Sequence, residues 1–219
     1  MRETMTADAD TLTSSPPDLS IEDRRRGMRR TYVGQALGQI LPWLLLQQAF
    51  GVLFLRHLGA TYLETMLPPA LLQLTLGLTI PTSLLVPPSR GKRWLLQCWF
   101  LFGLVLAAVL GATFLPLPPR PMVLVILGLL ILGAATYNLG TTFWFPLLHD
   151  LVPGEERGRY FGKMRTSWTA AVFLATLLVG WFLGEEPELW RFQVVIAVCL
   201  VLYFGRNAVG GAINIQTKK

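Results

Sequence analysis

The stretch Pro121–Leu148, PMVLVILGLLILGAATYNLGTTFWFPLL, contains no Asp, Glu, Lys or Arg. A helix rises about 1.5 Å per residue, so an apolar run of 18 or more residues can cross a bilayer core of roughly 30 Å. The next residues, HDLVPGEERGRYFGKMR (149–165), are rich in acids and bases, and a second uncharged run begins at Thr166. This alternation predicts helices that cross a membrane and are joined by a charged turn.

The composition of the whole chain is that of a protein that crosses the membrane several times. Of its 219 residues, 53% are hydrophobic and 15% are charged, whereas a soluble domain is about a quarter charged. The strands of a membrane barrel would alternate apolar and polar residues, and these apolar blocks are solid. We therefore predict an all-α membrane protein with six transmembrane helices. The predicted spans are 36–55, 66–86, 94–115, 122–147, 166–184 and 190–211.

These spans divide the chain into three parts. Residues 1–30 are predicted to form a disordered, basic N-terminal tail, because their polar start cannot bury enough surface to fold. Residues 31–212 are predicted to form the six-helix transmembrane domain, and 213–219 a short C-terminal tail.

Proline, glycine and tryptophan predict the local packing of the spans. Most prolines are expected at span borders, among them Pro68 and Pro69. Three others lie inside spans and predict mild kinks; they are Pro42, Pro81 and Pro146. Three glycines of the fourth span are expected to allow close helix packing; they are Gly128, Gly133 and Gly140. Most tryptophans fall near span ends, which predicts a belt at the lipid headgroups.

Basic residues are distributed unevenly between alternate loops. Lys and Arg accumulate in cytoplasmic loops. If the N-terminus is cytoplasmic, the inside segments are the two tails and the loops 87–93 and 148–165, and they hold nearly all of the 19 Lys and Arg. The exceptions are Arg56, Arg120 and Arg191. Arg206 is counted with the inside segments and is expected to reach the interface. The distribution predicts an integral protein of the plasma or inner membrane with both termini cytoplasmic.

The order of residues in the charged turn adds a family resemblance. DLVPGEERGRYFGKMR, from Asp150, resembles the loop between the fourth and fifth helices of major facilitator superfamily transporters. In that loop an acidic residue ends one helix, a proline follows, and an Arg-Gly-Arg turn opens the next. The shorter PPSRGKR, 87–93, is similar to the end of the superfamily's loop between the second and third helices. Gly91, Lys92 and Arg93 match its final glycine and two bases, whereas Pro88 stands where an aspartate is expected.

The resemblance covers nearly all of residues 30–211 and implies one half of such a transporter. Each half consists of nested three-helix inverted repeats, and substrate binds between the two halves. The implied function is movement of a small solute by alternating access, with the lipid bilayer and a second six-helix half as partners. That half would be a second copy or another chain. The alternative is a non-transporting membrane subunit, or an assembly protein, of a larger membrane complex.

Uncharged polar residues are the candidates for the substrate cavity, because the predicted spans carry no charge in their middles. In the superfamily the first and fourth helices line the central cavity, and the resemblance implies that the cavity residues lie there. They are Gln39, Gln47, Gln48, Tyr137, Asn138, Thr141 and Thr142. The last three share one helix face, since they are three and four residues apart. The same side chains could instead hydrogen-bond between helices.

The charged turns supply the predicted gating and topology residues. They are Gly91, Lys92, Arg93, Asp150, Arg157, Gly158, Arg159 and Arg165. We hypothesise that Asp150 replaces the missing loop acid by pairing with Arg90, Lys92 or Arg93, and so holds one access state. No GxSxG, HExxH, GxGxxG or Walker-type loop occurs. We expect no enzymatic activity, no catalytic residue, no cofactor, no metal and no nucleic-acid partner.

Overall fold

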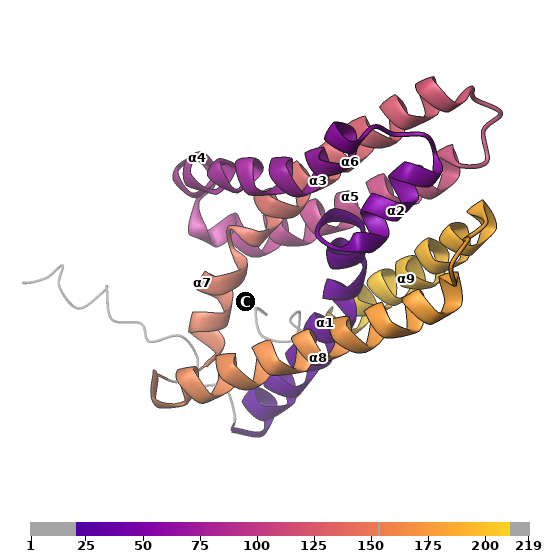
Figure 1. Ribbon diagram of the computed structural model, residues 1–219. Helices are drawn as coiled ribbons and strands as arrows, with labels where there is room; N and C mark the ends of the chain where they lie inside the picture. Colours follow the sequence, from indigo (N-terminus) through magenta and orange to yellow (C-terminus); the bar gives the residue numbers. More distant parts are fainter. Residues whose placement is uncertain (1–20, 153, 211–219) are drawn as a thin grey trace, which may run out of the picture.

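The computed structural model describes residues 21–152 and 154–210, and every regular element within them is a helix (Figure 1). The longer helices are α1 (Ile21–Leu46), α2 (Ala49–His57), α3 (Tyr62–Thr75), α4 (Thr79–Leu85), α5 (Gly91–Ala112), α6 (Pro119–Thr141), α7 (Trp144–Leu151), α8 (Arg157–Leu183) and α9 (Leu189–Gly210). Short 3-10 helices lie at Leu76–Leu78, Pro88–Arg90 and Gly154–Glu156. The predicted C-terminal tail and the first twenty residues of the N-terminal tail lie outside the described residues.

Five helical stretches of the described chain are long and apolar enough to cross a membrane. They are Tyr62–Leu85, Pro88–Ala112, Pro119–His149, Gly154–Leu183 and Leu189–Arg206. The pair α1–α2 passes the same test when taken together, with a bend of 46° between its two parts. A bend of that size keeps the chain moving forward, so we count α1–α2 as one broken span. In chain order we name α1–α2 span 1, α3–α4 span 2, α5 span 3, α6–α7 span 4, α8 span 5 and α9 span 6.

The turns between spans lie alternately at two ends of the bundle. In Figure 1 the turns before α3, α6 and α9 lie on the right, and the turns before α5 and α8 lie on the left. Each span therefore crosses the molecule once and the next one returns. This agrees with the predicted all-helical class, whereas the cytoplasmic side stays a prediction.

The helices pack in two groups. Spans 1, 5 and 6 form one group, because α1 packs against both α8 and α9. Spans 2, 3 and 4 form the other, because α6 packs against both α3 and α5. The groups meet mainly where α5 packs against α9, and also where α2 packs against α3. Fully buried aromatic side chains fill the core between them; they include Phe54, Phe102, Phe192 and Tyr203.

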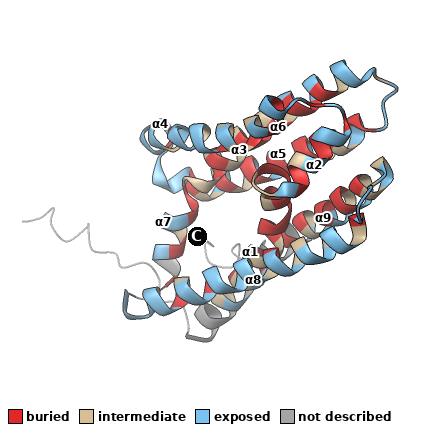
Figure 2. Ribbon diagram, viewed as in Figure 1, coloured by how far each residue is buried: buried red, intermediate tan, exposed pale blue. Residues whose placement is uncertain are grey.

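Spans 2 and 5 are the least covered of the bundle. Within their most apolar windows, 17% and 11% of the residues are buried, against 50% for spans 3 and 4. Figure 2 shows exposed residues along α4 and α8, and large apolar side chains such as Leu84 and Trp181 are among them. Lipid tails are as apolar as leucine, so a membrane can cover such surfaces without cost.

Two span boundaries differ from those expected. α1 begins at Ile21, inside the segment expected to be a tail, because arginine is a good helix former and continues the helix beyond the apolar run. Span 2 begins at Tyr62, where Thr61 and Glu64 form a reciprocal capping box. The prediction that Pro68 and Pro69 border this span is therefore wrong, since both lie inside α3.

Candidate functional site

Span 1 is interrupted at Gln47 and Gln48, between α1 and α2. A β-carbon at Gly51 would overlap the carbonyl oxygen of Leu45, so the turn requires glycine at this position. Proline distorts the helical turn that precedes it, whereas this break follows Pro42. The predicted kink at Pro42 therefore does not account for the break, which depends on Gly51.

A pocket of about 230 Å³ lies at this break. Gln47 and Gln48 line one side of it, and Pro68 and Pro69 of α3 line another. Thr65 also lines it. The pocket, which we call the break pocket, thus combines two side-chain amides and a threonine with an otherwise apolar wall.

Span 4 is also interrupted, at Thr142 and Phe143 between α6 and α7. Pro146 lies one turn later and cannot donate to the Thr142 carbonyl, so the kink predicted for Pro146 is present. The indole Nε1 of Trp94 donates to the carbonyl oxygen of Leu139 at 3.2 Å. A side chain of span 3 therefore satisfies a backbone group near this break, as the interior of a membrane protein requires.

Aromatic rings fill the surroundings of the span 4 break. A β-carbon at Gly91 would lie 2.6 Å from Cδ1 of Phe143, and one at Gly140 would lie 2.6 Å from Cδ1 of Trp99. The Trp99 and Trp144 rings are 5.1 Å apart and both are buried, so neither belongs to the predicted headgroup belt.

The predicted packing role of the glycines in span 4 is confirmed at Gly140 and Gly133, whose β-carbons would touch Trp99 and Phe102. It is wrong at Gly128, since no atom described lies within 4 Å of its β-carbon position.

Gln39 and Tyr137 connect span 1 to span 4. The Tyr137 hydroxyl donates to Oε1 of Gln39 at 2.9 Å, and the Gln39 side chain is buried. This bond joins α1 to α6, which are the two helices that the resemblance assigned to a central cavity. Tyr137 also packs against Phe102 of α5, with ring centroids 5.3 Å apart.

Asn138 faces a different neighbour from Tyr137, because successive residues of a helix point about 100° apart. Its Nδ2 donates to the Leu72 carbonyl at 2.7 Å and to Oγ1 of Thr75 at 2.8 Å, both in α3. Thr141 and Thr142 donate to carbonyls of their own helix at 2.9 and 3.3 Å. The seven cavity candidates therefore occupy four settings, since Gln47 and Gln48 line the break pocket.

Arg206 is a site residue that the sequence analysis missed. It is 4% exposed, so the expectation that it reaches the interface is wrong. Helical side chains lean toward the N-terminus of their helix, which carries that of Arg206 back into the bundle. Its Cζ lies 3.8 Å from the centroid of the Trp99 ring, and its side chain packs against Gly34 and Gly38 of α1. The sequence signal was the GxxxG pattern of GQALG, which provides space beside a helix.

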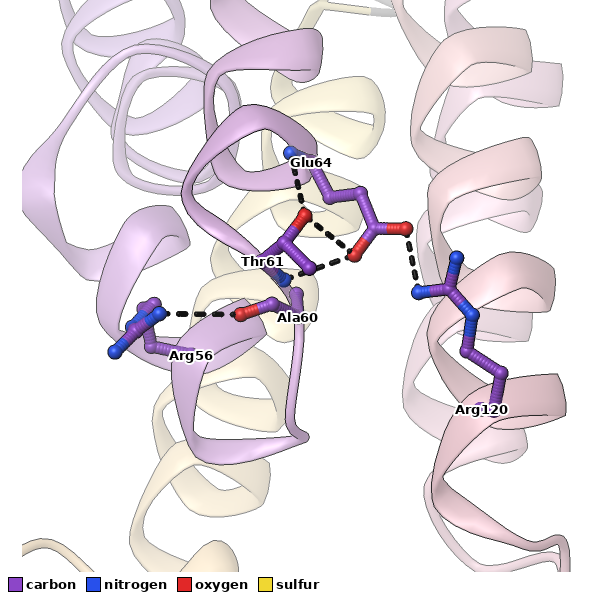
Figure 3. Close-up of polar contacts among 5 residues, drawn as sticks. All are labelled: Arg56, Ala60, Thr61, Glu64 and Arg120. Atoms are coloured by element: carbon purple, nitrogen blue, oxygen red, sulfur yellow. Dashed lines mark hydrogen bonds and ion pairs between the residues drawn. The ribbon is translucent and has the colours of Figure 1, made fainter.

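The arginines at the opposite end of the bundle all have local partners. Nη1 of Arg120 lies 2.6 Å from Oε1 of Glu64, and the same carboxylate accepts from the backbone N–H and the hydroxyl of Thr61 (Figure 3). Arg56 donates to the Ala60 carbonyl at 3.4 Å (Figure 3). Arg191 donates to two carbonyls at the end of α8. These contacts tie the turns to the helix ends and leave no comparable charge unpaired there among the described side chains.

The predicted gating residues have mixed settings. Arg157 donates to the carbonyl oxygens of Val152 and His149 at 3.1 and 3.0 Å, which caps the C-terminal end of α7 with a positive charge. Gly91 packs against Phe143 and Lys92 is half-buried. The remaining described residues of this set are exposed; they are Arg93, Gly158, Arg159 and Arg165. The side chain of Asp150 lies outside the described part, so its pairing stays a hypothesis.

Two places in the described helices thus combine polar groups with enclosure: the break pocket, and the buried guanidinium of Arg206 beside Trp99. Neither a family model, nor a curated protein, nor a solved structure matches this chain.

Proposed function

We propose that the chain is a six-span half of a major facilitator-type secondary transporter, which moves a small solute by alternating access together with a second six-helix half. The observation that carries the proposal is the symmetry of the helix packing. Let span 1 correspond to span 4, span 2 to span 5 and span 3 to span 6. The contact of α1 with α8 then corresponds to that of α6 with α3, and the contact of α1 with α9 to that of α6 with α5. The contact of α5 with α9 corresponds to itself, and all five pairs pack. Two inverted three-helix repeats predict this pattern.

Span 2 is divided by the 3-10 turn Leu76–Leu78, and the interruptions of spans 1 and 4 support the same proposal. Spans 1 and 4 correspond, and each consists of a long helix followed by a short one, α2 of nine residues and α7 of eight. Because spans 1 and 4 run in opposite directions, the short helices lie toward opposite ends of the bundle. Interrupted segments at corresponding positions of two repeats are where such transporters bind their substrates. The lightly covered spans 2 and 5 also correspond, and they offer surface for lipid or a second half.

The proposal includes an orientation, with both termini and residues 149–165 in the cytoplasm. Arg159, at the start of α8, and Glu186, in the turn before α9, are both exposed and lie at opposite ends of the bundle. Arg159→Cys and Glu186→Cys form a matched pair, since the native Cys98 and Cys199 are buried. In intact cells an impermeant maleimide is expected to label Glu186→Cys, and to label Arg159→Cys only after permeabilisation. Labelling of Arg159→Cys in intact cells would overturn the orientation and, with it, the kinship to transporters.

The transport function itself can be tested by access to the two breaks. Native mass of the purified protein is expected to show a second six-span unit, either a copy or another chain. In the reconstituted assembly, Gln48→Cys and Thr141→Cys are then labelled from opposite sides while small solutes are screened. A transported solute is expected to lower the labelling rate at one position and raise it at the other. Labelling rates that no solute changes, with no uptake, would instead favour a non-transporting subunit.

A further inference from the structure

The guanidinium of Arg206 is a buried positive charge whose two terminal nitrogens have no hydrogen-bonding partner in the described part of the chain. Among the described residues, neither Nη1 nor Nη2 has an acceptor. A guanidinium keeps its proton in proteins, so burial cannot be relieved by loss of the charge. A charge inside a membrane protein is costly unless it is paired, and it usually marks a functional site.

The contacts of Arg206 involve its aliphatic side chain and the flat face of its guanidinium, and leave the terminal N–H groups without acceptors among the described residues. The Trp99 indole lies under the guanidinium at 3.8 Å, which offsets part of the burial cost through attraction between cation and ring. Gly38 packs against the side chain so closely that a β-carbon there would overlap both Cδ and Nη1. Tyr203 is the next ring, 5.7 Å away, but its hydroxyl already donates to the Trp99 carbonyl. None of these contacts occupies the terminal N–H groups.

The acids of the described part lie elsewhere. Glu64 pairs with Arg120 at the opposite end of the bundle. The other carboxylates whose side chains are described lie in exposed turns; they are Glu155, Glu156, Glu185, Glu186 and Glu188. Trp99 lies about 12 Å along α5 from its first residue, so the guanidinium beside it is well inside the bundle. The compensating negative charge therefore comes from outside this part of the chain.

A second buried polar atom, without a partner in the described part of the chain, lies on α1. Oε1 of Gln35 is buried and, among the described residues, has no donor. Gln35 adjoins Gly34, which packs against the Arg206 stem, and precedes Gln39 by one helical turn. Oε1 of Gln39 already accepts from Tyr137, so Gln35 is the acceptor left over. Within the described helices, Arg206 thus has unused donors, and the α1 helix that packs against it has an unused acceptor.

We propose that Arg206 binds the oxyanion group, carboxylate or phosphate, of a small solute. The planar fork of a guanidinium matches both groups with two parallel hydrogen bonds, and the Gln35 amide suits a hydroxyl or amino group on the same solute. This inference names the substrate class of the proposed transporter and rests on that function for passage across the membrane. At 4% exposure Arg206 is enclosed, so the solute reaches it only when the helices around it move apart.

The test is thermal unfolding of the full chain in nanodiscs of zwitterionic phosphatidylcholine. Sodium phosphate and sodium lactate are titrated against sodium chloride at equal ionic strength. At least one oxyanion is expected to raise Tm with concentration while chloride does not, because ligand binding stabilises the folded state. Arg206→Met is expected to abolish the shift, and Arg206→Lys to weaken binding at least tenfold. No shift with either oxyanion, or an equal shift in Arg206→Met, overturns the proposal.

A glycine pair keeps the test decisive if Arg206→Met does not fold. Gly38→Ala displaces the guanidinium and is expected to lose the oxyanion shift. Gly34→Ala is the matched control, because its β-carbon would lie at an ordinary 3.8 Å from Cγ of Arg206. Retention of the shift in both variants contradicts the proposal.

Further results distinguish a solute from a lipid headgroup as the source of the negative charge, and distinguish failure of the oxyanion site from failure of the transport function. A rise in Tm with phosphatidylglycerol nanodiscs alone, and none with free oxyanions, would assign the site to a lipid headgroup and overturn the solute assignment. A shift that depends on Arg206, in an assembly without transport, would keep the binding site and remove the proposed function. Transport of an uncharged solute, with no shift in Tm by either oxyanion, would keep the proposed function and remove the oxyanion site.

Discussion

Spans 1 and 4 are both broken, but the two breaks differ in what surrounds them. In span 1 the close approach of Gly51 to the Leu45 carbonyl leaves a pocket lined by Gln47 and Gln48. In span 4 the ring of Phe143 fills the corner against Gly91, and Trp94 takes a carbonyl near the break. Equivalent positions of the bundle are therefore open near one end and sealed near the other. Under the proposed function, this asymmetry is what a single access state requires.

The largest effect is expected from Gly51→Ala, because the atom that a β-carbon would meet is a backbone oxygen. Backbone cannot move aside without unwinding the end of α1, so we expect a loss of at least about 3 kcal/mol, at the upper end of overpacking effects. Thermal unfolding in detergent measures it. Gly128→Ala is the control, since among the described residues nothing lies within 4 Å of that position, and it should gain up to about 1 kcal/mol. Similar stabilities for the two variants would show that the break does not depend on glycine.

Gly91→Ala tests the sealed break in the same way, with a smaller effect. Its β-carbon would meet the Phe143 ring at 2.6 Å, and a ring can shift, so we expect a loss of about 1 to 3 kcal/mol. Gly158→Ala is the matched control, because Gly158 also lies in the first turn of a helix and no described atom lies within 4 Å of its β-carbon position. A Gly91→Ala protein as stable as the Gly158→Ala control would mean that Phe143 does not seal the corner.

Features that depend on local sequence could be predicted for these spans. The length of the apolar blocks predicts the spans, and the missing N–H of Pro146 predicts the irregularity in span 4. Span 2 begins four residues before the predicted start at 66, because Thr61 and Glu64 cap the helix ahead of the apolar block, and their spacing is itself a recognisable signal.

Features that depend on contacts between distant helices could not be predicted from one sequence. The sequence does not distinguish Gly51 from other glycines in helices, because its close contact with the Leu45 carbonyl is visible only in the structure. Arg206 lies near the end of an apolar block, and only the packing of α9 against α1 and α5 shows that its side chain turns inward. Tyr137 and Asn138 were assigned together, and the helical rotation between them sends one toward α1 and the other toward α3.

Trp94→Phe tests the single hydrogen bond that satisfies a carbonyl near the break in span 4. The substitution keeps an aromatic ring but removes the N–H that donates to Leu139, so we expect a loss of about 1 kcal/mol. Trp181→Phe is the control, because that side chain is 85% exposed and should change stability by less than about 0.5 kcal/mol. If both variants unfold at the wild-type temperature, the Leu139 carbonyl has found another donor.

The smallest change in stability is expected at the open break, and its sign is informative. Gln48 occupies the N-cap position of α2 with extended backbone angles, yet its side chain makes no capping hydrogen bond. Serine is a preferred N-cap residue, so Gln48→Ser should stabilise the protein by about 0.5 to 1 kcal/mol. If the Gln48 amide contacts solute in the break pocket, the same variant should lose uptake in the reconstituted assembly. A variant that is more stable and equally active would make Gln48 a dispensable lining residue, and would leave Gln47 and Thr65 as the polar residues of the pocket.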